Sequence, residues 1–217
     1  MRSVLLIGLG RFGRYTAHKL NELNVQVMAV DKDEQRVNKV LGYVTNALIG
    51  DSTNQSFLSS LGINDYDACI VAIGDDFISS LETTSLLHEM GAKKVISRAA
   101  GKSQEKFLLR NGADLVVFPE RDLANETAIR ASSSSVLDYI NLEGEYAIFQ
   151  MKVPESWYGK TIASLNIRNV YGVNVLGVRK NGMLNMHVTA DTVMEPESSV
   201  MVLGKEEEIF RRFHLGE

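Results

Sequence analysis

A glycine-rich segment near the start of the chain has the spacing of a dinucleotide-binding turn. Gly8-Leu9-Gly10-Arg11-Phe12-Gly13 matches the pattern G-x-G-x-x-G. It follows an apolar run at residues 4–7 and precedes a helical pattern, the context that makes the motif meaningful. The first glycine permits a tight turn, the second lets the backbone approach a pyrophosphate, and the third lets helix and strand pack closely. The N–H groups and partial positive charge of the helix N-terminus favour an anion there.

A carboxylate 18 residues after Gly13 extends this signature. Asp31 ends the second apolar run, where a carboxylate accepts hydrogen bonds from the ribose of an adenine nucleotide. Its charge would repel a 2′-phosphate, which disfavours NADP, whereas NAD, ADP, ATP and S-adenosylmethionine all keep a free ribose. Arg11 would pair with phosphates bidentately. The alternative interpretation is that Arg11 is simply a solvated residue in the first turn of the helix. We predict a bound adenine nucleotide and leave its identity open.

Further polar residues follow the other strands of the predicted sheet. We expect Asp51 and Ser52, after the third strand, to cap a helix, to contact the adenine edge, or both. We expect the pair Asp75-Asp76 to cap a helix rather than to bind a metal. Arg98 ends the fifth strand and is a candidate phosphate ligand. Glu120 ends the sixth, and a carboxylate beside a polyphosphate requires a cation or an arginine between them.

The sequence lacks a general acid or base placed where a dehydrogenase would carry one. Tyr15 and Lys19 have the spacing of a short-chain dehydrogenase pair, but they lie on the first helix, away from the reactive end of a cofactor. The four histidines are isolated and lack metal-ligand spacing. We therefore predict a sensor rather than an enzyme, and an NAD-dependent oxidoreductase is the alternative from another class.

Six short apolar runs are expected to position these residues. They lie at residues 4–7, 25–30, 47–49, 68–73, 95–97 and 115–118, and each is followed by a helical pattern. Nearly continuous apolar strands indicate burial on both faces of a sheet, which crossover helices provide. The pattern predicts an α/β fold over residues 1–118: a Rossmann-like, doubly wound parallel sheet of six strands.

A change of pattern after residue 118 predicts a second, smaller domain. Crossover or hinge helices are expected at residues 119–142, including a short helix at 136–140, and the serines at 132–135 are either a hinge or a loop. Residues 143–217 predict a small α+β domain. It contains a period-2 strand from 147, a short helix at 161–165, a hairpin at Asn181-Gly182, a strand at 200–204 and a helix at 206–213.

Composition limits the function classes. The 217 residues include 23 Lys+Arg and 27 Asp+Glu, for a formal net charge of −4. This balance, without a basic stripe, argues against a nucleic-acid partner. No stretch approaches the ~20 apolar residues that span a bilayer, and the N-terminus does not read as a signal peptide. The single cysteine, Cys69, fits a reducing compartment. We expect a cytoplasmic protein that reaches a membrane only through a partner.

Several segments together resemble RCK (KTN) domains, the cytosolic regulators of potassium transporters and channels. Besides residues 4–13 and Val30-Asp31, they are residues 50–53 (GDST), 70–74 (IVAIG), 112–114 (GAD), 119–120 (PE) and 159–172 (GKTIASLNIRNVYG). The resemblance covers essentially the whole chain, and the C-terminal part is similar to the family's C-terminal (RCK_C) subdomain. The chain looks most like KtrA-type members, which carry a single RCK unit, whereas the similar TrkA-type members commonly carry two.

The resemblance implies a nucleotide-sensing regulatory subunit of a potassium uptake system, not an enzyme. ATP and ADP would compete at the glycine-rich site, and an NAD(H)-binding redox sensor of the TrkA type is the alternative. Dimers formed through the crossover helices would assemble into an octameric ring. The ring would gate a KtrB-like or TrkH-like membrane subunit at the inner face of the cell membrane.

The residues predicted to bind the nucleotide are Gly8, Leu9, Gly10, Arg11, Phe12, Gly13, Asp31, Lys32, Asp51, Ser52, Ala72, Ile73, Arg98 and Glu120. The resemblance implies that Ala72 and Ile73 contact the base. It also implies that Glu120 helps to hold a divalent or monovalent cation beside the phosphates across a dimer interface. Cyclic di-AMP would bind between C-terminal subdomains, with Arg168 and Asn174 as its residues; a solvated arginine and a strand-edge asparagine explain these two equally.

Overall fold

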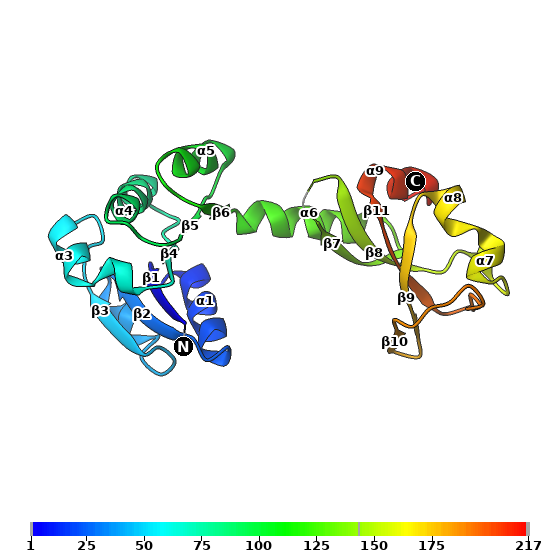
Figure 1. Cartoon of the computed structure of the whole chain (residues 1–217), viewed down its shortest axis with the longest axis horizontal. Helices are drawn as coiled ribbons and strands as arrows, with labels where there is room; N and C mark the ends of the chain where they lie inside the picture. The colour runs from blue at the N-terminus through cyan, green and yellow to red at the C-terminus, as the bar shows by residue number, and fades with distance from the viewer. Residues whose placement is uncertain (1, 143, 216–217) are drawn as a thin grey trace. The chain divides into compact units, whose positions relative to one another are not determined.

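The computed structural model describes residues 2–142 and 144–215 and separates into two compact units, Met1–Glu120 and Arg121–Glu217 (Figure 1). Each unit is built around a sheet of its own, with six strands in the first and five in the second. The division of the sequence at residues 118 and 142 into three segments stays a prediction. Within the described residues, none of the helices is long and apolar enough to cross a membrane.

The first unit contains the predicted six-stranded parallel sheet, in the order β3-β2-β1-β4-β5-β6. Its strands are β1 (Ser3–Ile7), β2 (Gln26–Asp31), β3 (Asn46–Ile49), β4 (Ala68–Val71), β5 (Val95–Arg98) and β6 (Leu115–Val117). The order reverses between β1 and β4, so the Rossmann-like, doubly wound topology is confirmed. In such a sheet, ligands bind in the crevice outside the carboxyl ends of the strands at the reversal.

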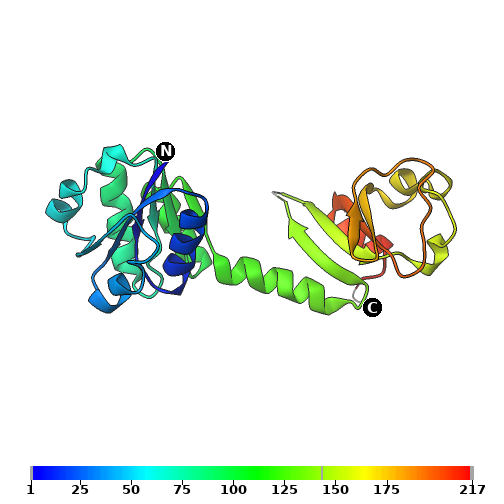
Figure 2. The ribbon, with the colours of Figure 1, turned by 90° about the horizontal axis from the view of Figure 1, so that it is seen from below.

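Helices cover both faces of this sheet (Figure 2). They are α1 (Arg11–Glu22), α2 (Glu34–Asn38), α3 (Gln55–Ser60), α4 (Phe77–Glu89) and α5 (Lys102–Arg110), with a 3₁₀ turn at Ile63–Asp65. On β1, Leu5 packs in the cluster that contains residues of α3 and α4, and Leu6 packs in the cluster that contains residues of α1 and α2. The prediction that every strand is buried on both faces is wrong for the edge strands, because Leu48, Ile49 and Leu115 are exposed.

The second unit is an antiparallel sheet in the order β10-β9-β11-β8-β7. Its strands are β7 (Val136–Asn141), β8 (Tyr146–Lys152), β9 (Asn174–Lys180), β10 (Met183–Asn185) and β11 (Ser199–Lys205); its helices are α7 (Ile162–Leu165), α8 (Ile167–Tyr171) and α9 (Glu206–Arg212), with a 3₁₀ turn at Glu155–Trp157. The core contains Phe149, Met151 and Trp157, all nearly inaccessible to solvent. The predicted hairpin is confirmed, because Asn181 and Gly182 both have positive φ between β9 and β10.

One predicted helix of the second part is wrong. Residues 136–140 belong to strand β7, which pairs with β8. Five residues are too few to distinguish a helical from an extended period, and pairing with β8 places the ring of Tyr139 5.1 Å from that of Phe149. The crossover therefore contains a single helix, α6 (Pro119–Ser132), which ends at the first serine of the run. The hinge role of the serines stays a prediction.

Candidate functional site

A cavity of about 740 Å³ opens at the carboxyl ends of the strands where the order of the first sheet reverses. Of the residues predicted to bind a nucleotide, those that line it are Gly8, Gly10, Arg11, Phe12, Asp31, Lys32, Asp51, Ser52, Ala72, Ile73, Arg98 and Glu120. Leu9 and Gly13 do not line it: Leu9 is fully buried in the core, and Gly13 packs against the turn. The structure thus brings residues from six separate segments of the chain to one place.

The three glycines meet the geometric demands that their spacing predicts. Gly8 has φ +93, and a Cβ atom there would lie 3.0 Å from the backbone of Ala72 and Ile73. A Cβ at Gly13 would lie 1.9 Å from the carbonyl oxygen of Gly8. A Cβ at Gly10 would meet nothing within 4 Å. Gly8 and Gly13 are therefore required by the fold itself, whereas Gly10 leaves open space beside the backbone, as a ligand would need.

The N-terminus of α1 lacks a cap from its own chain. Gly10 occupies the cap position, makes no side-chain hydrogen bond to the helix, and no acidic residue stands in the first turn. The first N–H groups of an α-helix have no partner within the helix, so they remain donors for an anion. Arg11, the first helical residue, is exposed at the cavity. A cation is disfavoured at a helix N-terminus unless an anion accompanies it.

Asp31 holds the glycine turn as well as lining the cavity. One carboxylate oxygen, Oδ2, accepts a hydrogen bond from the backbone N–H of Leu9 at 2.6 Å, and Oδ1 accepts one from that of Asp33 at 2.9 Å. The side chain is 4% exposed, and Nη1 of Arg36 lies 3.8 Å from Oδ2. Asp31, the residue predicted to bind the ribose, is thus held in its orientation by the same glycine turn that would bind the phosphates.

Arg98 lies against the other wall of the cavity. Its side chain is 16% exposed, pairs with Glu120 and lies with its guanidinium carbon 5.8 Å from the centre of the Phe12 ring. The Nε atom is buried without a hydrogen-bond acceptor, which costs about 1–3 kcal/mol for a polar group. The guanidinium also occupies the space that a Cβ at Gly74 would take. Glycine at position 74 is what allows Arg98 to lie here.

Asp51 and Ser52 have partners that the sequence did not predict. The prediction that this segment caps a helix is wrong, because the cap of α3 is Asn54. The Oδ1 atom of Asp51 accepts from the backbone N–H and the hydroxyl of Thr53, and these hydrogen bonds lower the pKa of Asp51 below its ordinary value. The hydroxyl of Ser52 is buried 2.8 Å from that of Thr83. Ser52 therefore lines the cavity, and its hydroxyl is held by Thr83 of α4.

The expected capping role is confirmed for Asp76, whose carboxylate caps α4 by accepting from the backbone and hydroxyl of Ser79. Asp75 lines the cavity. No group of three or more metal-ligating side chains occurs among the residues that the structure describes.

Two basic residues were missed by sequence reasoning. Arg14 and Arg36 line the cavity, and Arg14 donates to the carbonyl oxygen of Leu9 at 3.2 Å. Arg14 stands three residues after Arg11, one helical turn along α1, and that spacing was the available signal. Arg36 follows Asp31 by five residues on α2, and only the packing of α2 beside β2 brings it back to the carboxylate.

The residues implied in a second ligand site lie in the second unit. Arg168 is exposed on α8, and Asn174 is the exposed first residue of β9, opposite Leu203 of β11. In the sheet, β10 pairs only with Val178, Arg179 and Lys180 of β9, so among the described strands Asn174 has a paired neighbour on the β11 side alone. A ligand role for this pair stays a prediction.

Two family models match the chain. Residues 4–119 match the TrkA-N domain and residues 148–214 match the TrkA-C domain. The chain is 37% identical over 206 residues to Ktr system potassium uptake protein C of Bacillus subtilis, covering 95% of this chain and 93% of that protein. It is 32% identical to Ktr system potassium uptake protein A of the same organism, with the same coverage.

Solved structures share the fold. A GsuK channel bound to NAD superposes with a TM-score of 0.67 at 18% identity, covering all of this chain and 40% of that one. A GsuK structure bound to ADP superposes with a TM-score of 0.53 at 14% identity, covering 62% of this chain and 36% of that one. The chain thus spans less than half the length of these GsuK chains.

Proposed function

The chain belongs to the RCK family of TrkA-N and TrkA-C domain proteins, and from that premise we propose that it is the nucleotide-sensing regulatory subunit of a potassium uptake system. The Ktr relatives over 95% of the chain support potassium uptake as the process. The relatives are named as potassium uptake proteins, and the sequence lacks a general acid or base placed where a dehydrogenase would carry one. The subunit acts at the inner face of the membrane through its partner.

The observation that carries the nucleotide part of the proposal is the pairing of two anion-seeking features in one cavity. The uncapped N-terminus of α1 and the guanidinium of Arg98, whose Nε lacks an acceptor, both border it. In this proposal Arg11 and Arg98 hold the phosphates and Asp31 holds the ribose. Asp51 and Lys32 border the adenosine, and Ala72 and Ile73 offer backbone and apolar contact to the base.

ATP and ADP are the ligands we propose, with NAD(H) as the alternative. ATP has one phosphate more than ADP. The added negative charge would be attracted by Arg11, by Arg98 and by a cation held by Glu120. Glu120 is 57% exposed and pairs with Arg98, so a cation site there needs further ligands from the phosphates or from another chain. NAD(H) is supported by the NAD-bound GsuK structure of the same fold.

Thermal unfolding of the full chain with ATP, ADP, NAD and NADH, each with and without magnesium, tests the choice. A ligand at 100 times its dissociation constant stabilises the folded state by about 2.7 kcal/mol. Arg98→Gln is expected to reduce the shift from every phosphate ligand, and Glu120→Gln only the magnesium-dependent part. Lys19→Gln, on the exposed part of α1 and paired with Glu22, is the matched control. A shift with NADH alone overturns the ATP and ADP assignment.

We also propose that the chain forms dimers that assemble into an octameric ring beneath a KtrB-like or TrkH-like membrane subunit, and that cyclic di-AMP is a second ligand. A nucleotide shifts a conformation only through its differential affinity for two states. Small-angle scattering of the purified chain with ATP and with ADP is expected to differ. Identical profiles would exclude a ring whose shape responds to the nucleotide. Binding of cyclic di-AMP that survives in Arg168→Ala and Asn174→Ala would exclude the second site.

A further inference from the structure

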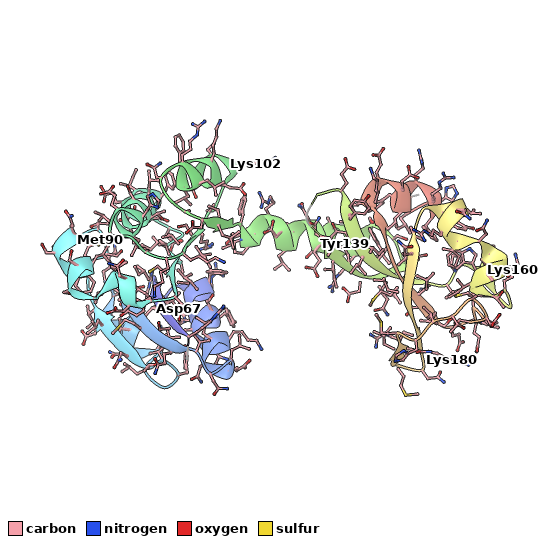
Figure 3. All side chains as sticks on the ribbon, viewed as in Figure 1. Asp67, Met90, Lys102, Tyr139, Lys160 and Lys180 are labelled. Atoms are coloured by element: carbon pink, nitrogen blue, oxygen red, sulfur yellow. The ribbon has the colours of Figure 1, made fainter. Side chains whose placement is uncertain are left out.

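A second cavity, of about 450 Å³, lies in the second unit and contains none of the residues discussed as ligands above. It is bordered by strands β8, β9 and β11, by the turn that precedes β11 and by the β9–β10 hairpin. Lys180, the last residue of β9, marks the hairpin end of this sheet in Figure 3.

Two cations flank this cavity in one row across the sheet. Ser199 of β11 lies opposite Lys152 of β8 on one side and opposite Arg179 of β9 on the other. Directly opposed residues of an antiparallel sheet share a face, with Cβ atoms about 5 Å apart. All three line the cavity. Lys152 and Arg179 therefore stand on the same face of the sheet, about 10 Å apart at their Cβ atoms, with a serine hydroxyl between them.

Neither cation has a carboxylate partner among the residues that the structure describes. Within the part of the chain that the structure describes, Lys152 makes no ion pair. Arg179 donates from Nη1 to the carbonyl oxygen of Gly182 at 3.0 Å, and its Nε is buried without an acceptor. The neighbouring cation, Lys180, is by contrast neutralised by Glu195. Like charges brought to one row without a counter-ion favour the entry of an anion.

The floor of the cavity supplies a further donor. Ser199 is 5% exposed and Gln150 is 9% exposed. The Nε2 atom of Gln150 donates to the Ser199 hydroxyl at 2.9 Å. A hydroxyl that accepts one hydrogen bond still has its own proton to give. Among the described residues that line the cavity, Glu197 is the one acidic residue against two cations, so these side chains carry a net positive charge.

We propose that this cavity binds a small oxyanion, the phosphate or carboxylate group of a metabolite, between Lys152 and Arg179. The anion accepts from the two cationic side chains and from the Ser199 hydroxyl. Binding satisfies the guanidinium of Arg179 and neutralises the row of charge. The site lies within one unit and is independent of the cavity at the first sheet.

Equilibrium dialysis of the full chain with radiolabelled inorganic phosphate, and with succinate as a competing dicarboxylate, tests the proposal. Lys152→Gln and Arg179→Gln are each expected to weaken one saturable component about tenfold or more, the loss of a charge-assisted hydrogen bond. Lys180→Gln is the matched control, because this neighbour alternates to the other face of the strand. Arg98→Gln, which weakens phosphate binding at the first cavity, distinguishes that component from binding at the second cavity. Circular dichroism checks that each variant is folded. Lys152 is exposed at the end of β8, so its substitution is expected to leave the fold intact, and Lys152→Gln tests the site without Arg179→Gln.

The outcomes divide cleanly. A component lost in Lys152→Gln and retained in Lys180→Gln and Arg98→Gln supports the site. Competition by succinate assigns it to carboxylates as well as phosphates, and its absence restricts it to phosphates. Equal loss in Lys180→Gln would show a general charge effect and overturn the proposal. So would phosphate and succinate binding that Lys152→Gln leaves unchanged, or the absence of saturable binding at millimolar anion.

Discussion

Replacing Asp31 separates its role in the fold from its role toward a nucleotide. Its carboxylate, 4% exposed, accepts hydrogen bonds from the backbone N–H groups of Leu9 and Asp33 at 2.6 and 2.9 Å. Asp31→Ala leaves both donors without an acceptor. A buried polar group that loses its partner costs about 1–3 kcal/mol. We therefore expect the first unit to lose about 3 kcal/mol of its free energy of unfolding, without any ligand present.

Asp31→Asn is expected to cost about half as much, because an amide has one carbonyl oxygen to accept with and presents its NH₂ group to the second donor. The matched control is Asp33→Ala. This neighbouring carboxylate caps α2 by accepting from the backbone of Gln35 at 2.8 Å, and a helix cap is worth about 1 kcal/mol. The expected order of loss is Asp31→Ala, then Asp31→Asn, then Asp33→Ala.

Urea unfolding distinguishes the two units, because the single tryptophan, Trp157, lies in the core of the second. Far-UV circular dichroism follows both units, while Trp157 fluorescence follows the second. Asp31→Ala should move the dichroism transition that Trp157 does not share. A loss in Asp31→Ala no greater than in Asp33→Ala would refute the structural role assigned to this carboxylate, which accepts one buried and one partly buried hydrogen bond. The nucleotide would then be the only reason for an acid at this position.

Three other predictions concern single groups. Gly13→Ala is expected to abolish folding of the first unit, since its Cβ would lie 1.9 Å from a carbonyl oxygen, while Gly10→Ala should fold and lose only phosphate affinity, with thermal shift as the readout. The pKa of Asp51 is lowered by hydrogen bonds from the backbone N–H and the hydroxyl of Thr53. Thr53→Val removes only the hydroxyl donor, so it should raise the pKa of Asp51 part of the way to its ordinary value. The stability those bonds give is present at neutral pH and lost as pH falls through the pKa of Asp51, which NMR titration of its carboxyl checks. Burial raises the pKa of Cys69 to about 12, so iodoacetamide at pH 8 (about the pKa of a free thiol) should label it only in urea.

The parallel sheet was predictable because its signal is repetitive. Six apolar runs of nearly even spacing, each with a helical pattern behind it, agree on one topology. The prediction of burial failed at the two edge strands of this sheet. Leu48 and Leu115 are apolar, as residues of buried strands are, yet they lie on the outer strands of the sheet and are exposed. Sequence alone does not show which strand of a sheet is last, since that depends on the order of strands in space.

The second unit shows where local pattern is insufficient. Asn181 and Gly182 specify a turn by their own backbone preferences, so the hairpin was predictable from the sequence. The run at residues 136–140 has no such specification, and its strand conformation comes from pairing with β8, next to it in the sheet. Likewise, Arg36 reaches Asp31 through helix packing. Contacts made between elements, rather than within them, are the part that the sequence left undetermined.

The pair Arg98 and Glu120 offers a physical route from nucleotide to conformation. Arg98 ends β5 and is largely buried, whereas Glu120 stands at the start of α6, the helix that leads out of the first unit. In the proposed function, a third phosphate would be a second anionic acceptor for the guanidinium of Arg98, which pairs with Glu120, and would weaken that pair. A cation between the phosphate and Glu120 would attract both groups and hold the carboxylate beside the nucleotide. ATP with a cation and ADP alone would then hold the first turn of α6 by different contacts, which is the differential interaction that a two-state response requires.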